Sequence, residues 1–183
     1  MTERLRRAGR GRDSDGWWVI WSVAEGRRGR RWREVRQEEG IVASSLLLET
    51  DQAGRFSHLE LSTSAGLLTL HPERDGSLHG NTVTLDGIAH VRGLAWDPDG
   101  LVVIEGSTIS TVAAVALQRP ALLEGASISR PGVVVKRDLS VELSPIVVTR
   151  TSRERWLVGD DPLEVDAAGL PVLRDAETWP LED

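Results

Sequence analysis

The chain has 183 residues, a net charge of −6 at neutral pH and no cysteine. This is the size of one ordinary domain, and it excludes disulfides and thiolate metal sites. Hydrophobic residues make up 40% of the chain and no apolar run approaches the roughly 20 residues that cross a bilayer, so we expect a globular protein without a membrane span, located in a reducing cytoplasm.

The N-terminal region is strongly basic. Residues 1–36 contain eleven arginines and five acidic residues, a net charge of +6, so the other residues carry −12. We predict a basic, flexible arm over residues 1–15 and a single domain over residues 16–183. A basic segment can bind nucleic acid, but the acidic remainder would repel phosphates and no nucleic-acid-binding motif accompanies the arginines. We therefore expect no nucleic-acid partner, and interpret the run GRRGRRWR as an exposed hairpin.

Three tryptophans stand together at the start of this domain. Trp17, Trp18 and Trp21 are predicted to share one strand, with Trp17 and Trp21 on the face opposite Trp18. Exposed indole rings stack on sugars or line lipid slots. We interpret these three as core or interface side chains, with an exposed binding face as the alternative.

Turn signals then recur about every ten residues, including Asp-Gly pairs at 75–76, 86–87 and 99–100. A strand of five or six residues plus a tight turn has this length. The segments between the turns alternate between apolar and polar residues, as at Leu139, Val141 and Leu143, or form continuous apolar runs such as GLVVIEG. This regular spacing of turns predicts a mostly-β protein with a long antiparallel sheet of many short strands. The continuous runs predict strands covered on both faces, as in a sheet curled around one helix.

The best helix candidate covers residues 107–125. Its alanines favour a helix that Pro120 or Gly125 would end. Its β-branched residues, such as Ile109 and Val112, favour a strand. The periodicity does not separate the two; we favour a strand over residues 108–117, with a helical turn near 120–124.

The chemistry in the sequence is sparse. No nucleophile elbow, phosphate-binding loop, dinucleotide fingerprint or zinc-protease motif occurs. The four histidines, His58, His71, His79 and His90, have no spacing that one strand or helix would bring together. We therefore predict no metal site, no cofactor and no catalytic residues, and expect a protein that is not an enzyme.

Along its length the chain resembles a family of bacterial proteins named for glycolipid binding, formerly a domain of unknown function. The resemblance lies in an ordered series of short motifs: VIWSV; LLLETDQAGRFSHLEL with Asp51 and Arg55; TLDGIAHVRG with Leu85, Asp86 and Gly87; TISTVAAVAL with Ser110 and Thr111; and VDAAGLPVL with Asp166, Gly169 and Pro171. The chain departs from the family where Ala113, Val115 and Ala116 stand in place of a proline and paired arginines.

The resemblance implies a spiral β-roll, a long antiparallel sheet wrapped around one helix and similar to lipoprotein-carrier folds. It also implies dimers, and places ligand-binding residues at Asp51, Arg55, Asp86, Ser110 and Thr111.

Two functions follow as expectations. The first is a non-catalytic binding protein for a glycolipid or other lipid-like amphipathic molecule, which needs a cavity of several hundred Å³ on the concave face of the curled sheet. The second is a structural or interaction protein that forms a homodimer without a small ligand. A third, an enzyme acting on glycolipids or related esters, would need some of Asp51, His58, Asp86, His90 and Thr111 to converge in one cleft.

Overall fold

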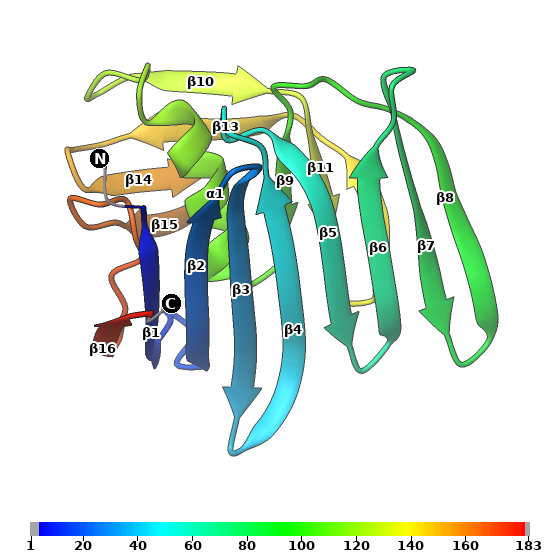
Figure 1. Ribbon diagram of the computed structural model, residues 1–183, viewed down its shortest axis with the longest axis horizontal. Helices are drawn as coiled ribbons and strands as arrows, with labels where there is room; N and C mark the ends of the chain where they lie inside the picture. Colours follow the sequence, from blue (N-terminus) through cyan, green and yellow to red (C-terminus); the bar gives the residue numbers. More distant parts are fainter. Residues whose placement is uncertain (1–3, 182–183) are drawn as a thin grey trace.

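A computed structural model describes residues 4–181, and its main element is a nine-stranded antiparallel sheet. Eight strands follow one another as a meander, and the last strand of the chain is added beside the first, in the order β16-β1-β2-β3-β4-β5-β6-β7-β8 (Figure 1). Their bounds are β1 Arg6–Arg12, β2 Trp18–Gly26, β3 Gly29–Glu38, β4 Ile41–Thr50, β5 Phe56–Thr63, β6 Gly66–Pro72, β7 Ser77–Thr84, β8 Gly87–Ala95 and β16 Arg174–Pro180.

Two smaller sheets and one helix complete the fold of residues 4–181. The order β10-β13-β14-β15 forms a four-stranded antiparallel sheet, and β12-β11-β9 forms a three-stranded sheet in which β9 and β11 are parallel. The bounds are β9 Leu101–Ile104, α1 Thr108–Gln118, β10 Ser127–Arg130, β11 Gly132–Val135, β12 Val141–Leu143, β13 Ile146–Arg150, β14 Arg155–Val158 and β15 Asp161–Glu164. Figure 1 shows α1 between the nine-stranded sheet and the four-stranded sheet, whose strands cross those of the larger one.

The predicted mostly-β class and the antiparallel sheet of many strands are confirmed. The sheet is open, with β16 and β8 at its edges, and is not a closed barrel. No helix in the described part of the chain is long and apolar enough to cross a membrane.

One face of the large sheet forms the core. Side chains alternate along each strand, so that Leu46 pairs with Leu61 and Leu61 with Leu68 on the buried face. These leucines, Trp21 and Trp32 form one cluster with the buried residues of α1 and of the smaller sheets. The space between the sheets is therefore filled by the protein's own side chains.

The strand favoured over residues 108–117 is wrong, because Thr108–Gln118 is the helix α1. Ser107 caps its start, since the side chain accepts a hydrogen bond from the backbone N–H of Ser110. The helix contacts β3, β9, β14 and β15, so Ile109 and Val112 are buried among different elements. Burial from several sides outweighs the weak preference of β-branched residues for strands.

The flexible arm predicted over residues 1–15 is also wrong where the structure describes it. Arg6–Arg12 is the strand β1, paired with β2 on one side and β16 on the other. Gly9 makes this packing possible, because a Cβ at this position would lie 2.7 Å from the Trp21 ring. Residues 1–3 of the predicted arm lie outside the described residues.

Candidate functional site

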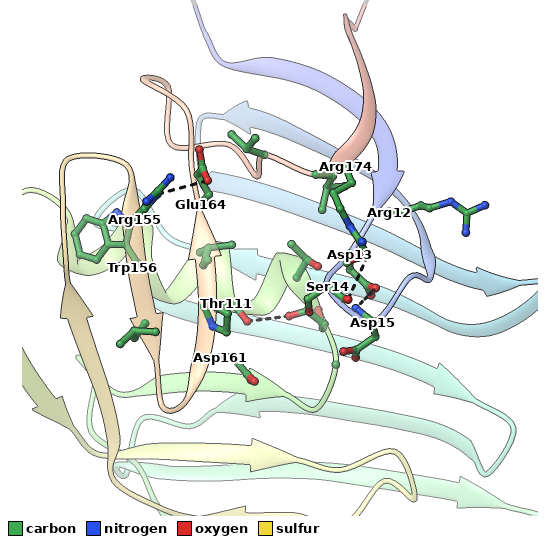
Figure 2. Close-up of a pocket in the computed structure, with 18 of the residues that line it drawn as sticks. Arg12, Asp13, Ser14, Asp15, Thr111, Arg155, Trp156, Asp161, Glu164 and Arg174 are labelled. Atoms are coloured by element: carbon green, nitrogen blue, oxygen red, sulfur yellow. Dashed lines mark hydrogen bonds and ion pairs between the residues drawn. The ribbon is translucent and has the colours of Figure 1, made fainter.

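A cleft of about 610 Å³ lies at the N-terminus of α1. Its walls come from the loop between β1 and β2, from β14 and β15, and from the segment that leads into β16. Figure 2 shows Arg155, Trp156 and Glu164 on one side, Arg174 and the loop of Asp13 on the other, and α1 between them.

The start of α1 is held by side chains from two parts of the chain. Ser107 accepts the Ser110 N–H at 3.1 Å. Oε2 of Glu34, on β3, accepts the Ile109 N–H at 2.8 Å. Thr111, which lines the cleft, donates its hydroxyl to the Ser107 carbonyl at 2.9 Å. Two backbone N–H groups that the helix N-terminus would otherwise offer to a ligand, and the Thr111 hydroxyl, are thus used within the protein.

Glu34 is fully buried behind this cleft. Burial raises the pKa of its carboxyl from 4.5 to about 7. Three contacts lower the pKa of Glu34: the hydrogen bonds from Ile109 and Ser107, and the charge of Arg36. The loss of hydration on burial outweighs them. The side chain therefore changes charge near neutral pH inside the core.

A buried ion pair joins the loop before β2 to β3. Nη2 of Arg36 lies 2.6 Å from Oδ2 of Asp13, and both side chains are almost fully buried. Oδ1 of Asp13 accepts the backbone N–H groups of Asp15 and Trp17. The Arg36 guanidinium also lies 5.1 Å from the centre of the Trp17 ring. These contacts fix the loop that forms one wall of the cleft.

The opposite wall carries an indole ring and aliphatic groups. Trp156 is buried, and its Nε1 donates to no acceptor in the described protein. Arg155 and Glu164 form an ion pair of 3.8 Å beside it. The remaining apolar lining comes from Leu157, Pro162, Leu163, Val172 and Leu173.

The cleft contains nearly balanced charge. Four arginines and five acidic residues line it, and many of these pair with one another or with backbone groups, as Arg174 does with the carbonyls of Asp13 and Ser14. Such a surface favours a neutral or zwitterionic molecule that also has an apolar part, because a strongly charged ligand would find no matching excess charge.

The five residues predicted to bind ligand do not come together. Thr111 lines the cleft, whereas the Ser110 side chain is buried and accepts the Ile104 N–H at 3.0 Å. Asp51 caps the turn between β4 and β5, where its Oδ1 accepts the N–H of Ala53 and of Arg55. Arg55 pairs with Asp99 at 2.8 Å. Asp86 is at the turn between β7 and β8.

The histidines lie on four neighbouring strands away from the cleft. His71 and His79 face each other across β6 and β7, a closeness that their separation in the sequence does not show. His58 and His71 pair with Glu60 and Glu73, each at 3.0 Å. Among the described residues no group of three or more ligands is placed to hold a metal. Asp51 lies at the turn between β4 and β5, Asp86 at the turn between β7 and β8, and Thr111 in the cleft, whereas His58 and His90 lie on β5 and β8.

Sequence reasoning missed Glu34, Trp156 and the loop of Asp13. No motif surrounds Trp156 in the sequence, so nothing there indicates a cleft beside it. No local signal marks Glu34, because its partner Ile109 lies 75 residues further along the chain.

Fold and site together define a mostly-β protein with an open nine-stranded antiparallel sheet and a lateral cleft beside its helix. No protein-family model and no curated protein matches the chain. Among solved structures it is similar to a DUF1089 family protein from Pseudomonas aeruginosa, with a TM-score of 0.56 over 84% of this chain and 86% of that chain, at 14% sequence identity. This likeness is one of fold alone. The name of that protein states no ligand.

Proposed function

We propose that this chain is a non-catalytic binding protein for a small amphipathic molecule, such as a glycolipid or another lipid-like compound, and that the cleft at the N-terminus of α1 holds it. The observation that carries the proposal is the composition of the cleft. An indole and several aliphatic side chains line a hollow of about 610 Å³ whose charged groups nearly cancel. Such a hollow can bury an apolar chain and leave a polar head group among the paired charges.

The binding place differs from the one expected from the sequence. The family resemblance led us to expect an acyl chain on the concave face of a sheet rolled around the helix, as in lipoprotein carriers. In this structure the core cluster and α1 occupy the space against that face. The cleft beside the helix is the alternative that the geometry offers, and with no cysteine in the chain we place this function in the cytoplasm.

Native mass spectrometry of the purified chain, with solvent extraction of bound lipid, tests this proposal. We expect co-purifying amphipathic molecules, or saturable uptake of octyl glucoside below its micelle concentration. Val172→Asp puts a charge into the cleft at a side chain that is 48% exposed. Its matched control is Val147→Asp on β13, outside the cleft, at 42% exposure. Binding that V147D retains and V172D loses supports the proposal. No binding by the unmodified chain, or equal binding by both variants, overturns it.

A second candidate is a homodimer without a small ligand, and a specific surface favours it. Leu67, Val83 and Ile88 pair across β6, β7 and β8 and form an exposed apolar row that ends at the open edge strand. Isolated exposed apolar residues are ordinary, whereas a continuous row beside an unpaired strand edge is a frequent site of association.

A further inference from the structure

A second hollow, of about 350 Å³, lies beside the C-terminal half of α1 and shares no lining residue with the cleft. Its walls are the turn between β2 and β3, the turn between β4 and β5, and one side of the helix. Only a glycine at position 29 lets the first turn approach β4 this closely, because a Cβ there would lie 1.9 Å from the Thr50 carbonyl oxygen. Small residues on the other walls, Gly26, Gly54, Ala113 and Ala116, keep the hollow open.

Two polar side chains of this hollow lack hydrogen-bond partners in the described protein. They are the indole Nε1 of Trp32 and the hydroxyl Oγ1 of Thr50. Trp32 is 1% exposed and Thr50 is 7% exposed. The register pairs Trp32 with Leu48, two residues before Thr50 on the neighbouring strand, so both side chains lie on the same face in diagonal positions. A buried N–H without an acceptor costs about 1–3 kcal/mol, a cost that a ligand oxygen in contact with the indole would remove.

The rim supplies further hydrogen-bonding groups with a small excess of negative charge. Glu25, Arg30 and Asp51 line the hollow, two carboxylates against one guanidinium. The Arg30 guanidinium lies 6.0 Å from the centre of the Trp32 ring and 3.9 Å from the Glu25 carboxylate. An anion would meet the surplus carboxylate, whereas a hydroxyl group can accept from the indole N–H and donate to Thr50 or to a carboxylate.

We propose that this hollow is a second binding site, for a small uncharged hydroxylated molecule whose oxygen accepts the indole N–H of Trp32 and exchanges a hydrogen bond with Thr50. Asp51 contributes from the rim, since its Oδ1 caps the local turn and its Oδ2 enters no hydrogen bond among the described residues. This site does not depend on the cleft or on the function proposed for it.

The indole N–H signals of the full-length ¹⁵N-labelled chain give a direct test. The chain has seven tryptophans, and each indole gives one resolvable signal. We titrate myo-inositol, D-glucose and glycerol, with glucose 6-phosphate as the anionic control. The expected result is a saturable shift of the Trp32 signal by a neutral polyol, weaker binding of the phosphate, and no comparable shift of Trp156 in the cleft. D-glucose against octyl glucoside then distinguishes a free sugar from a sugar carried on an alkyl chain.

Variants of Thr50 connect the shift to the proposed contact. Thr50→Val keeps the shape and removes the hydroxyl, and we expect about a fivefold to tenfold weaker binding; Thr50→Ser restores it. Thr111→Val, an equally buried threonine in the cleft, leaves binding at the hollow unchanged. The proposal is overturned if no polyol shifts Trp32 saturably, if all indole signals move alike, if T50V binds as the unmodified chain does, or if only ordered water occupies the hollow in a crystal grown with myo-inositol. If T50V does not fold, the titration of the unmodified chain still tests whether a polyol contacts Trp32.

Discussion

Oε2 of Glu34, on the third strand of the large sheet, accepts the backbone N–H of Ile109 in the first turn of α1 at 2.8 Å. Because Glu34 is fully buried, its pKa is raised from 4.5 to about 7. This contact joins the large sheet to the helix that forms the inner end of the cleft. The start of the helix is therefore held by a core carboxyl whose pKa lies near neutral pH.

We expect stability to fall as the pH rises through the range in which Glu34 loses its proton. Its pKa is higher in the folded protein than in the unfolded chain, so the folded state holds the extra proton between pH 4.5 and about 7. The contribution of this group is fully present below pH 4.5 and is lost as the pH rises through 7. Its size is on the order of 3 kcal/mol.

Glu34→Gln keeps an oxygen for the Ile109 N–H but cannot lose a proton. It should therefore flatten the dependence of the unfolding free energy on pH. Urea unfolding from pH 5 to pH 8 measures it, with Glu154→Gln on an exposed side chain as the control. If E34Q and E154Q both decline with pH as steeply as the unmodified chain, Glu34 is not the responsible group.

Removing one partner of the buried pair should be strongly destabilising. Asp13→Asn removes the buried carboxylate that lies 2.6 Å from the Arg36 guanidinium and leaves only the exposed Asp15 near it. Losing the partner of a buried charge costs about 3–5 kcal/mol. Asp15→Asn is the matched control, because this exposed carboxylate lies 3.9 Å from the same guanidinium and should cost less than about 1 kcal/mol. Equal losses in urea unfolding would contradict the difference in burial between the two pairs.

Gly9→Ala tests whether residues 6–12 pack as a strand. The added methyl group would lie 2.7 Å from the Trp21 ring and 2.9 Å from the Glu177 carbonyl oxygen. Overpacking of this kind costs about 1–3 kcal/mol. Gly26→Ala serves as the control, since no atom lies closer than 4.0 Å to a Cβ at that position. A flexible arm would tolerate both substitutions equally. Unchanged thermal stability of G9A would therefore contradict the packing of β1 in the sheet.

The parts of the fold that could be predicted are those controlled by neighbouring residues. The Asp-Gly turns at 75–76 and 86–87 are local signals, and they led correctly to the antiparallel strands on either side of them. The helix α1 was missed because its residues favour strand locally and become helical through burial by elements distant in the chain. The strand β1 was missed because arginine dominates it, although its pairing with β2 and β16 needs only backbone groups and two small glycines.

The candidate sites were harder to predict for the same reason. The cleft combines residues 12–15, the start of α1 and residues 151–174, which no motif spans. The second hollow contains Asp51, a residue that the family resemblance named as ligand-binding, but its unpaired groups are Trp32 and Thr50. Strand pairing and burial bring the residues of these sites together. The spacing of residues along the sequence shows neither of them.

The exposed apolar row of Leu67, Val83 and Ile88 ends at the edge strand β8. If the chain forms a homodimer through this row, Ile88→Lys should convert the dimer to a monomer, because Ile88 is 67% exposed next to the open edge and a lysine there would be buried without a partner. Ile41→Lys, at 73% exposure on β4, is the matched control and should leave the dimer intact. Sedimentation velocity over a range of protein concentrations measures both variants. A monomeric unmodified chain, or a dimer that survives I88K, excludes this row as the interface, because an apolar contact centred on Ile88 could not tolerate the added charge.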